Sequence, residues 1–228
     1  MKTAVVFVSY LEVPEQRLHD HFCWNDAAYR ENDVRVFVVS DRPHDVPEHA
    51  TVLVFPVEWL PVVDGKPRFS LTLTKNFGNS IAAASGAESI ICTDVDIAFP
   101  QHRFRELSDV NNETANIPLY RMAPSFEAMK EGRLDHGCTG TIVMTADNWL
   151  RIRFDERCVG YGADDGILLR DIQNARLKVD RTVIVSHVAH VPGDGVRHPG
   201  SGSATCWGRD SGFNFDNFQE NRKLHRLR

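Results

Sequence analysis

Short apolar runs rich in β-branched residues alternate with longer amphipathic stretches through the first hundred residues of this 228-residue chain. Continuous apolar runs of this length are typical of strands in a parallel sheet, because crossover helices cover both of its faces. The pattern predicts strands at 4–8, 34–39, 51–57 and 89–93, and helices at 14–30 and 71–87. We therefore expect an α/β fold with a mixed, mainly parallel sheet flanked by helices.

The pattern changes after residue 100, where two of the expected strands could pair antiparallel. The expected elements are strands at 116–120, 139–144 and 182–188, a helix at 164–174, and a loop or short helix at 124–133. Residues 192–216 are rich in Gly, Ser, Pro and Asp and are expected to form a mobile loop. No linker separates the two halves, so the sequence favours one continuous domain over 1–228.

Charge and cysteine content narrow the class of protein. A net charge of −5 shows no large basic excess, so a nucleic-acid partner is not favoured, although a local basic groove is not excluded. The five cysteines are scattered without a Cys-x-x-Cys pair, which favours free thiols in a reducing compartment. No apolar run approaches the roughly 20 residues that cross a bilayer. We expect a cytoplasmic protein without a membrane span; the oligomeric state stays open.

The acidic triplet Asp94-Val95-Asp96 follows the apolar run 89–93. Strand residues two apart point to the same side, so both carboxylates can face one cavity while Val95 packs behind them. Two carboxylates at a strand end suit a hard divalent cation, and that cation can hold a diphosphate. An isolated Asp-x-Asp is more often a solvated turn, so the hypothesis depends on the surrounding sequence.

Three segments together resemble the GT-A class of glycosyltransferases. Residues 75–79 (Lys-Asn-Phe-Gly-Asn), with the helix and acidic triplet that follow, resemble the family's "Asn-x-Gly, helix, strand, Asp-x-Asp" block. Residues 154–156 and 160–165 resemble a segment of β-1,4-galactosyltransferase-like and related family-2 enzymes. Residues 186–191 are similar to a segment of polypeptide GalNAc-transferases, in which the later His completes a metal site. The order and spacing of the three segments fit the family.

This resemblance implies a GT-A (Rossmann-like) fold, with a nucleotide-binding half at 1–100 and an acceptor half at 101–228. It implies an enzyme that transfers a sugar from a nucleotide sugar, expected to be UDP-linked, to an acceptor hydroxyl. The expected cofactor is Mn²⁺ or Mg²⁺, held by Asp94, Asp96 and His190. Mn²⁺ tolerates mixed oxygen and imidazole ligands better than Mg²⁺ usually does. His187 is the alternative third ligand, and His190 could also be an ordinary surface histidine.

Asp165, with its neighbour Asp164, is the candidate general base. A carboxylate at the start of a helix is stabilised by the helix dipole, and burial under a sugar acceptor would raise its pKa towards a useful value. If Asp165 is the base, the resemblance implies inversion at the anomeric carbon. The alternative is that the two aspartates only cap the helix at 164–174.

The expected contacts with the nucleotide sugar come from both halves of the chain. The predicted residues are Ser9, Asp41, Arg68, Lys75, Asn76, Asp94, Val95 and His198. Asp41 follows the second strand and could accept from uracil N3–H or a ribose hydroxyl, or it could be an ordinary turn residue.

The residue that binds the diphosphate is open. Leu71 stands where the family often has an Arg, so Arg68 and Lys75 are the basic candidates. Asn76 could shape the helix entry near the phosphates or simply start the helix, and His198 could swing over the diphosphate from the expected mobile loop.

Two other functions fit the same half-fold. A nucleotidyltransferase acting on sugar phosphates would normally have a Gly- and Arg/Lys-rich loop after the first strand, and residues 9–12 (Ser-Tyr-Leu-Glu) lack it. A non-catalytic carbohydrate-binding relative would keep the fold without turnover. The donor sugar and the acceptor, whether glycan, lipid, protein or nucleobase, are not specified by the sequence.

Overall fold

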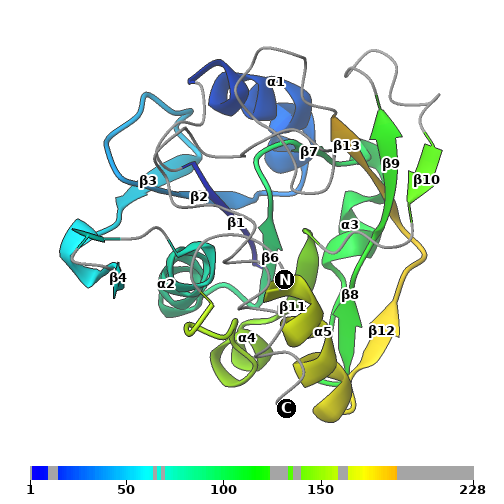
Figure 1. Ribbon diagram of the computed structural model, residues 1–228. Helices are drawn as coiled ribbons and strands as arrows, with labels where there is room; N and C mark the ends of the chain where they lie inside the picture. Colours follow the sequence, from blue (N-terminus) through cyan, green and yellow to red (C-terminus); the bar gives the residue numbers. More distant parts are fainter. Residues whose placement is uncertain are drawn as a thin grey trace.

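The computed structural model describes residues 2–9, 15–63, 66–67, 70–123, 133–135, 140–158 and 164–188. Its centre is a seven-stranded sheet with the strand order β12-β8-β11-β6-β1-β2-β3 (Figure 1). These strands are β1 (Thr3–Val8), β2 (Arg35–Ser40), β3 (Ala50–Val54), β6 (Ser89–Thr93), β8 (Thr114–Asn116), β11 (Ile142–Thr145) and β12 (Lys178–Asp180). Only β11 runs opposite to its two neighbours in this sheet, which confirms the mainly parallel arrangement.

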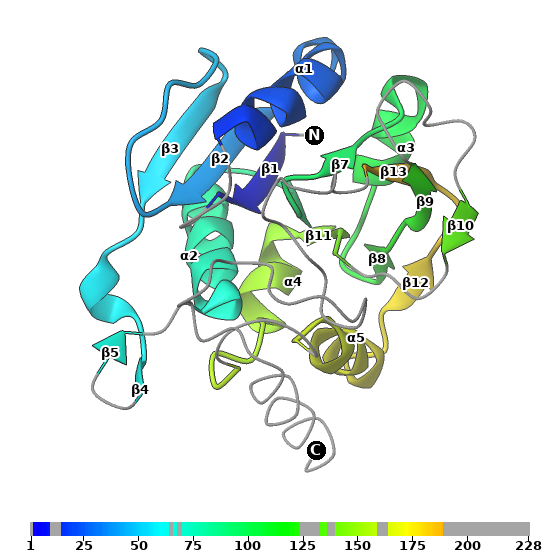
Figure 2. The same ribbon diagram turned by 45° about the horizontal axis from the view of Figure 1, so that its top comes forward.

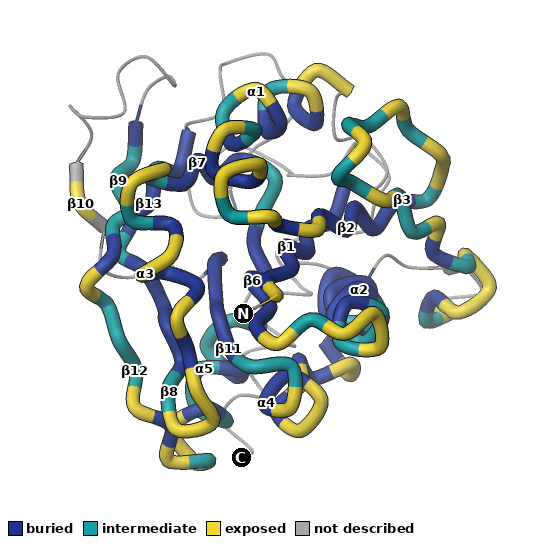
Figure 3. Tube along the Cα trace, turned by 180° about the vertical axis from the view of Figure 1, so that it is seen from behind, coloured by how far each residue is buried: buried dark blue, intermediate teal, exposed yellow. Residues whose placement is uncertain are grey.

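Helices cover both faces of this sheet. They are α1 (Glu15–Glu31), α2 (Leu71–Ala84), α3 (Phe104–Ser108), α4 (Ala146–Arg151) and α5 (Asp164–Asn174). Alternate residues of β1 enter two separate cores: Val6 packs with residues of α2, α4 and α5, and Phe7 packs with residues of α1 and α3. The central strands are accordingly buried, while the outer turns of the helices are exposed (Figure 3). Burial on both faces explains the continuous apolar runs in the sequence.

A second sheet lies beside the first and reaches the acidic triplet. Its order is β10-β9-β13-β7, with β7 (Ile97–Ala98), β9 (Leu119–Ala123), β10 (Arg133–Asp135) and β13 (Ile184–Val188). β7 follows the triplet directly and pairs antiparallel with β13, so that His187 lies opposite Ile97 (Figure 2). Residues ninety apart in the chain therefore meet next to Asp96.

Smaller elements complete the described chain. A two-stranded hairpin is formed by β4 (Val62–Val63) and β5 (Lys66–Pro67), and two 3-10 helices are η1 (Val57–Trp59) and η2 (Gln101–Arg103). Within the described ranges, no helix has the length and apolar character needed to cross a bilayer.

Two predicted boundaries in the sheets are wrong. The strand expected at 116–120 is divided between β8 and β9, which belong to different sheets, because Pro118 has no N–H to continue a ladder. The strand expected at 51–57 ends at Val54, and Pro56 precedes η1. The antiparallel pairing of the two strands after residue 100 is confirmed, with Val143 opposite Asn116. Residues 124–132 and the segment 192–216 lie outside the described residues.

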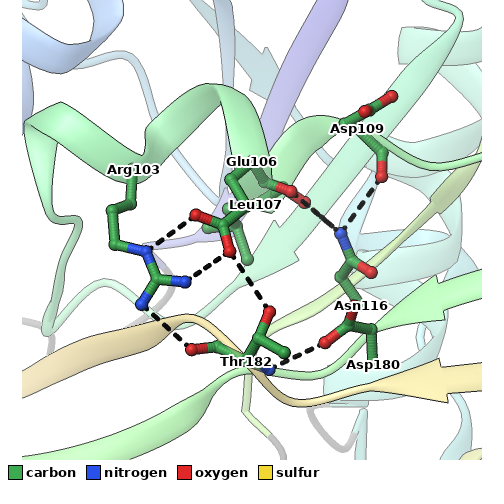
Figure 4. A network of polar contacts seen from close by, with 7 residues as sticks. All are labelled: Arg103, Glu106, Leu107, Asp109, Asn116, Asp180 and Thr182. Atoms are coloured by element: carbon green, nitrogen blue, oxygen red, sulfur yellow. Dashed lines mark hydrogen bonds and ion pairs between the residues drawn. The ribbon is translucent and has the colours of Figure 1, made fainter.

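A polar network attaches the start of β13 to α3 (Figure 4). Arg103 Nη1 donates to Thr182 O at 3.0 Å, and Arg103 also pairs with Glu106, which accepts from the Thr182 hydroxyl. Asn116 Nδ2 donates to Leu107 O at 2.8 Å. The exposed Arg103–Glu106 pair adds little on its own, since water screens it. The bonds to backbone atoms fix the approach of β13 to the acidic triplet.

Candidate active site

The acidic triplet lies at the carboxyl end of β6, between β6 and β7. β6 pairs with β1 and β1 pairs with β2, so three parallel strands end side by side. Ser9 follows β1 and donates its N–H to Val39 O at 2.9 Å, and Asp41 follows β2 and accepts from the Ser40 hydroxyl at 3.3 Å. The edge formed by Ser9, Asp41 and Asp94 is where ligands bind in open α/β sheets.

Asp94 forms an ion pair with Lys75 of α2. The lysine ammonium lies 2.9 Å from Asp94 Oδ1, and the lysine side chain is only 2% exposed. Burial by itself lowers the pKa of Lys75, but nearby carboxylates, above all Asp94 and then Asp165 and Asp164, outweigh burial and raise the pKa above its ordinary value. Lys75 therefore stays charged.

Asp96 is held from the opposite side by His187. Asp96 Oδ2 lies 3.1 Å from His187 Nε2, and both side chains are buried. Burial lowers the pKa of His187, while the Asp96 carboxylate raises it, and the net result is a pKa above the ordinary value. Val188 N donates to Asp96 O at 2.9 Å. The alternative histidine of the sequence analysis thus contacts the triplet; His190 lies outside the described residues and stays a prediction.

Gly140 leaves the space that Asp94 occupies. A Cβ atom at residue 140 would lie 2.2 Å from Asp94 Oδ2, far inside van der Waals contact. The other oxygen of this carboxylate is bonded to Lys75, so the side chain cannot move away without losing that bond. A glycine at this position is therefore required by the placement of Asp94.

Gly140→Ala is expected to lower the free energy of unfolding by about 1–3 kcal/mol, because overpacking forces Asp94 or the backbone to shift. In an Asp94→Ala background the same change is expected to cost much less, since the clashing oxygen is gone. Denaturant unfolding of the four proteins measures both costs. Equal costs in the two backgrounds would show that the clash is not with Asp94.

Asn76 joins two of the three motif segments. Its Oδ1 accepts from Phe154 N at 3.0 Å, and its Nδ2 donates to Phe154 O at 3.0 Å and to Glu156 Oε1 at 2.9 Å. The alternative that Asn76 starts the helix is wrong, because α2 begins at Leu71 and Ser70 caps it. Asn76 fixes the segment that leads to α5; a contact with the nucleotide stays a prediction.

Of the remaining predicted site residues, the structure describes Val95, Asp164 and Asp165. Val95 is partly buried between the two aspartates, and Asp164 is more deeply buried than Asp165 in the first turn of α5. Arg68 and His198 lie outside the described residues, so their predicted contacts with the diphosphate are not tested.

The donor chemistry at the triplet fits a divalent cation. Asp94 and Asp96 supply carboxylate oxygens, which suit a hard divalent cation; one oxygen of Asp94 bonds to Lys75 and one of Asp96 to His187. Among the described residues, however, no group of three or more His, Cys, Asp or Glu side chains could hold a metal ion. A cation at Asp94 and Asp96 would therefore need another ligand, which His190 or a bound diphosphate could supply.

Comparison with known proteins identifies the fold. No family model matches the chain, and no curated protein matches it with significance. Solved catalytic domains of GT-A type glycosyltransferases do match, and the sheet with its flanking helices is the one they share. The protein therefore has the GT-A fold, as the three motif segments predicted.

Three of these structures are similar over most of the chain. Drosophila β1,4-galactosyltransferase 7, in complex with xylobiose, is 14% identical, with a TM-score of 0.56 over 83% of this chain and 72% of its own. A Pyrobaculum calidifontis mannosyltransferase with GDP-Man and Mn²⁺ is 14% identical, with a TM-score of 0.53 over 84% and 58%. GalNAc-T7 with UDP, GalNAc and Mn²⁺ is 10% identical, with a TM-score of 0.54 over 90% and 46%. Identities this low establish the fold alone.

Proposed function

We propose that the protein is a metal-dependent glycosyltransferase that transfers a sugar from a UDP-sugar to an acceptor hydroxyl with inversion. The observation that supports this most is the acidic triplet at the carboxyl end of β6, where the parallel strands β1 and β2 also end. The fold neighbours add support: a mutant of the Drosophila enzyme was solved with manganese, UDP-Gal and xylobiose, and GalNAc-T7 with UDP and Mn²⁺. The Pyrobaculum enzyme was instead solved with GDP-Man, a sugar linked to a different nucleotide.

Asp94, Asp96 and His190 are the proposed ligands of the cation. Bound Mn²⁺ or Mg²⁺ supplies a Lewis acid that neutralises charge on the leaving diphosphate. Lys75 holds Asp94 through its ammonium, and Gly140 leaves room for the carboxylate. Both contacts fix the Asp94 carboxylate before a nucleotide sugar arrives. Less reorganisation is then needed during transfer.

Further residues would orient the rest of the donor. Ser9 and Asp41, at the ends of β1 and β2, are proposed to contact the nucleoside. Arg68 and His198 are proposed to contact the phosphates, and Asn76 holds the 154–156 segment.

Asp165 is the proposed general base. It lies in the first turn of α5, where the helix dipole favours an ionised carboxylate, and it is more exposed than Asp164. Asp165 would take the proton from the acceptor hydroxyl while the hydroxyl oxygen bonds to the anomeric carbon and the bond to the diphosphate breaks. Attack from the side opposite the leaving group inverts the configuration.

Thermal melting with nucleotides tests the proposal. UDP with Mn²⁺ is expected to raise the melting temperature, because a ligand that binds only the folded state stabilises it. GDP with Mn²⁺ is expected to raise it less, and EDTA is expected to abolish the shift. Hydrolysis of a UDP-sugar without acceptor would then separate an enzyme from a non-catalytic binding relative. No Mn²⁺-dependent shift with any nucleotide or nucleotide sugar would contradict the proposal.

A further inference from the structure

Helix α1 carries a row of buried polar side chains that the proposed chemistry does not use. His21, Asn25 and Tyr29 are spaced by four, so they lie along one face of the helix, and each is 0% exposed. This face packs in the core that also contains Ile97 of β7 (Figure 1). Burying three polar groups is costly unless each is hydrogen-bonded, so their partners show what the row does.

His21 bonds to the middle of the acidic triplet. Its Nδ1 lies 2.9 Å from Val95 O, and its Nε2 lies 2.7 Å from the Tyr29 hydroxyl. A carbonyl oxygen only accepts, so Nδ1 must carry the hydrogen that is donated to Val95. Burial lowers the pKa of His21 to about 4, so the ring is neutral at neutral pH and Nε2 accepts from Tyr29. The Val95 carbonyl thereby fixes the tautomer, and the Tyr29 hydroxyl satisfies the other ring nitrogen.

Asn25 bonds to the backbone that follows the triplet. Its Nδ2 donates to Ile97 O at 2.9 Å, and its Oδ1 accepts from Phe99 N at 2.8 Å. The start of β7 and the residue that follows β7 are therefore both fixed to α1 by one side chain. The two residues His21 and Asn25 hold three backbone groups between residues 95 and 99.

The bond from His21 acts on the position of Asp96. Val95 O belongs to the planar peptide unit that ends at the Asp96 Cα atom, so an oriented carbonyl also orients that atom. The next peptide unit is held by the bond from Val188 N to Asp96 O. Both peptide units that flank Asp96 are thus fixed, one from α1 and one from β13.

Packing alone does not explain a histidine at this position. The ring of His21 lies 4.1 Å from that of Phe7 and 5.8 Å from that of Phe22, measured between centroids. An apolar ring would suit these neighbours without the cost of burying an imidazole. What it would not supply is the donor for the part-buried Val95 O, which would lose this partner.

We propose that His21, whose second ring nitrogen is bonded to the Tyr29 hydroxyl, is a positioning residue for the cation-binding triplet, acting through the Val95 carbonyl on the Asp96 carboxylate. This inference rests on the proposed function, since it concerns the affinity of the same site for Mn²⁺. Partners that orient metal ligands typically change metal affinity by about 10–100-fold when they are removed.

Two substitutions separate the donor from the ring. His21→Phe keeps a ring and removes the donor, and His21→Asn keeps an N–H donor near the Nδ1 position and removes the ring. Mn²⁺ affinity is measured from the electron paramagnetic resonance signal of free Mn²⁺, with and without UDP, and the free energy of unfolding is measured in parallel. His21→Phe is expected to weaken Mn²⁺ binding about 10–100-fold, and His21→Asn is expected to bind within about threefold of wild type despite a lower stability.

Phe22→Leu is the matched control, because Phe22 is buried on the same helix and its ring packs against those of Phe7, His21 and His49 without bonding to the triplet backbone. It is expected to lose stability and keep Mn²⁺ affinity. Tyr29→Phe removes only the hydroxyl and is expected to weaken Mn²⁺ binding by a few-fold, which keeps the test available if a His21 variant does not fold.

The outcomes distinguish the two proposals. If His21→Phe or, where it does not fold, Tyr29→Phe binds Mn²⁺ as tightly as wild type, the positioning role is overturned and the proposed function is unaffected. Loss of affinity in every variant in proportion to lost stability, Phe22→Leu included, would also overturn it. If wild-type protein binds no Mn²⁺ with or without UDP, both proposals fail.

Discussion

Asp96→Asn is expected to abolish the Mn²⁺-dependent rise in melting temperature with UDP and to lower glycosyl transfer at least 100-fold. The substitution keeps the shape of a side chain that is buried against His187 and removes its negative charge. A neutral amide oxygen is a poorer ligand for a hard cation, and the remaining carboxylate of Asp94 already bonds to Lys75 through one oxygen. Melting curves with UDP and Mn²⁺, and rates at saturating Mn²⁺, measure the two effects.

Asp180→Asn provides the control for this prediction. Asp180 also accepts a hydrogen bond near β13, from Thr182 N at 2.7 Å (Figure 4). It lies at the end of β12, an edge strand that β8 and β11 separate from β6. The variant is expected to keep the nucleotide shift. If Asp96→Asn retained the full Mn²⁺-dependent shift, Asp96 would not be a ligand of the cation.

The elements of the parallel sheet could be predicted because their signal is local. The runs that became β1 and β6 are apolar on both sides, and α5 begins and ends where its sequence pattern does. The position of the acidic triplet follows from the same signal, since it depends only on where β6 ends. The split between β8 and β9 was also visible in principle, at Pro118.

Contacts between distant segments could not be predicted in the same way. The approach of His187 to Asp96 depends on β13 pairing with β7, and nothing in either short segment specifies that partner. Lys75 was expected at the diphosphate because of its charge, and its bond to Asp94 follows from how α2 packs on β6. Burial of a charge against a particular partner is a property of the packed fold.

The buried row on α1 had a signal that the sequence analysis did not use. Among the apolar residues of this helix, Leu18 and Phe22 are buried, whereas Trp24 is only partly buried. His21 and Asn25 continue the face of Leu18 and Phe22 at helical spacing. Polar residues on an apolar helix face indicate buried hydrogen bonds.

Asp165→Asn is expected to leave Mn²⁺-dependent UDP binding unchanged and to lower kcat for transfer by about 10²–10⁴-fold, the usual contribution of a general base. An asparagine can still accept a hydrogen bond from the acceptor hydroxyl but cannot take its proton. The carboxylate lies in the first turn of α5 and contributes to the raised pKa of Lys75.

Asp164→Asn is the matched comparison: Asp164 is more buried, so its replacement is expected to affect stability more than kcat. Single-turnover rates with donor and Mn²⁺ saturating measure the chemical step. Transfer by Asp165→Asn at the wild-type rate would remove Asp165 from the mechanism, and a slow Asp164→Asn with a normal Asp165→Asn would assign the base to Asp164.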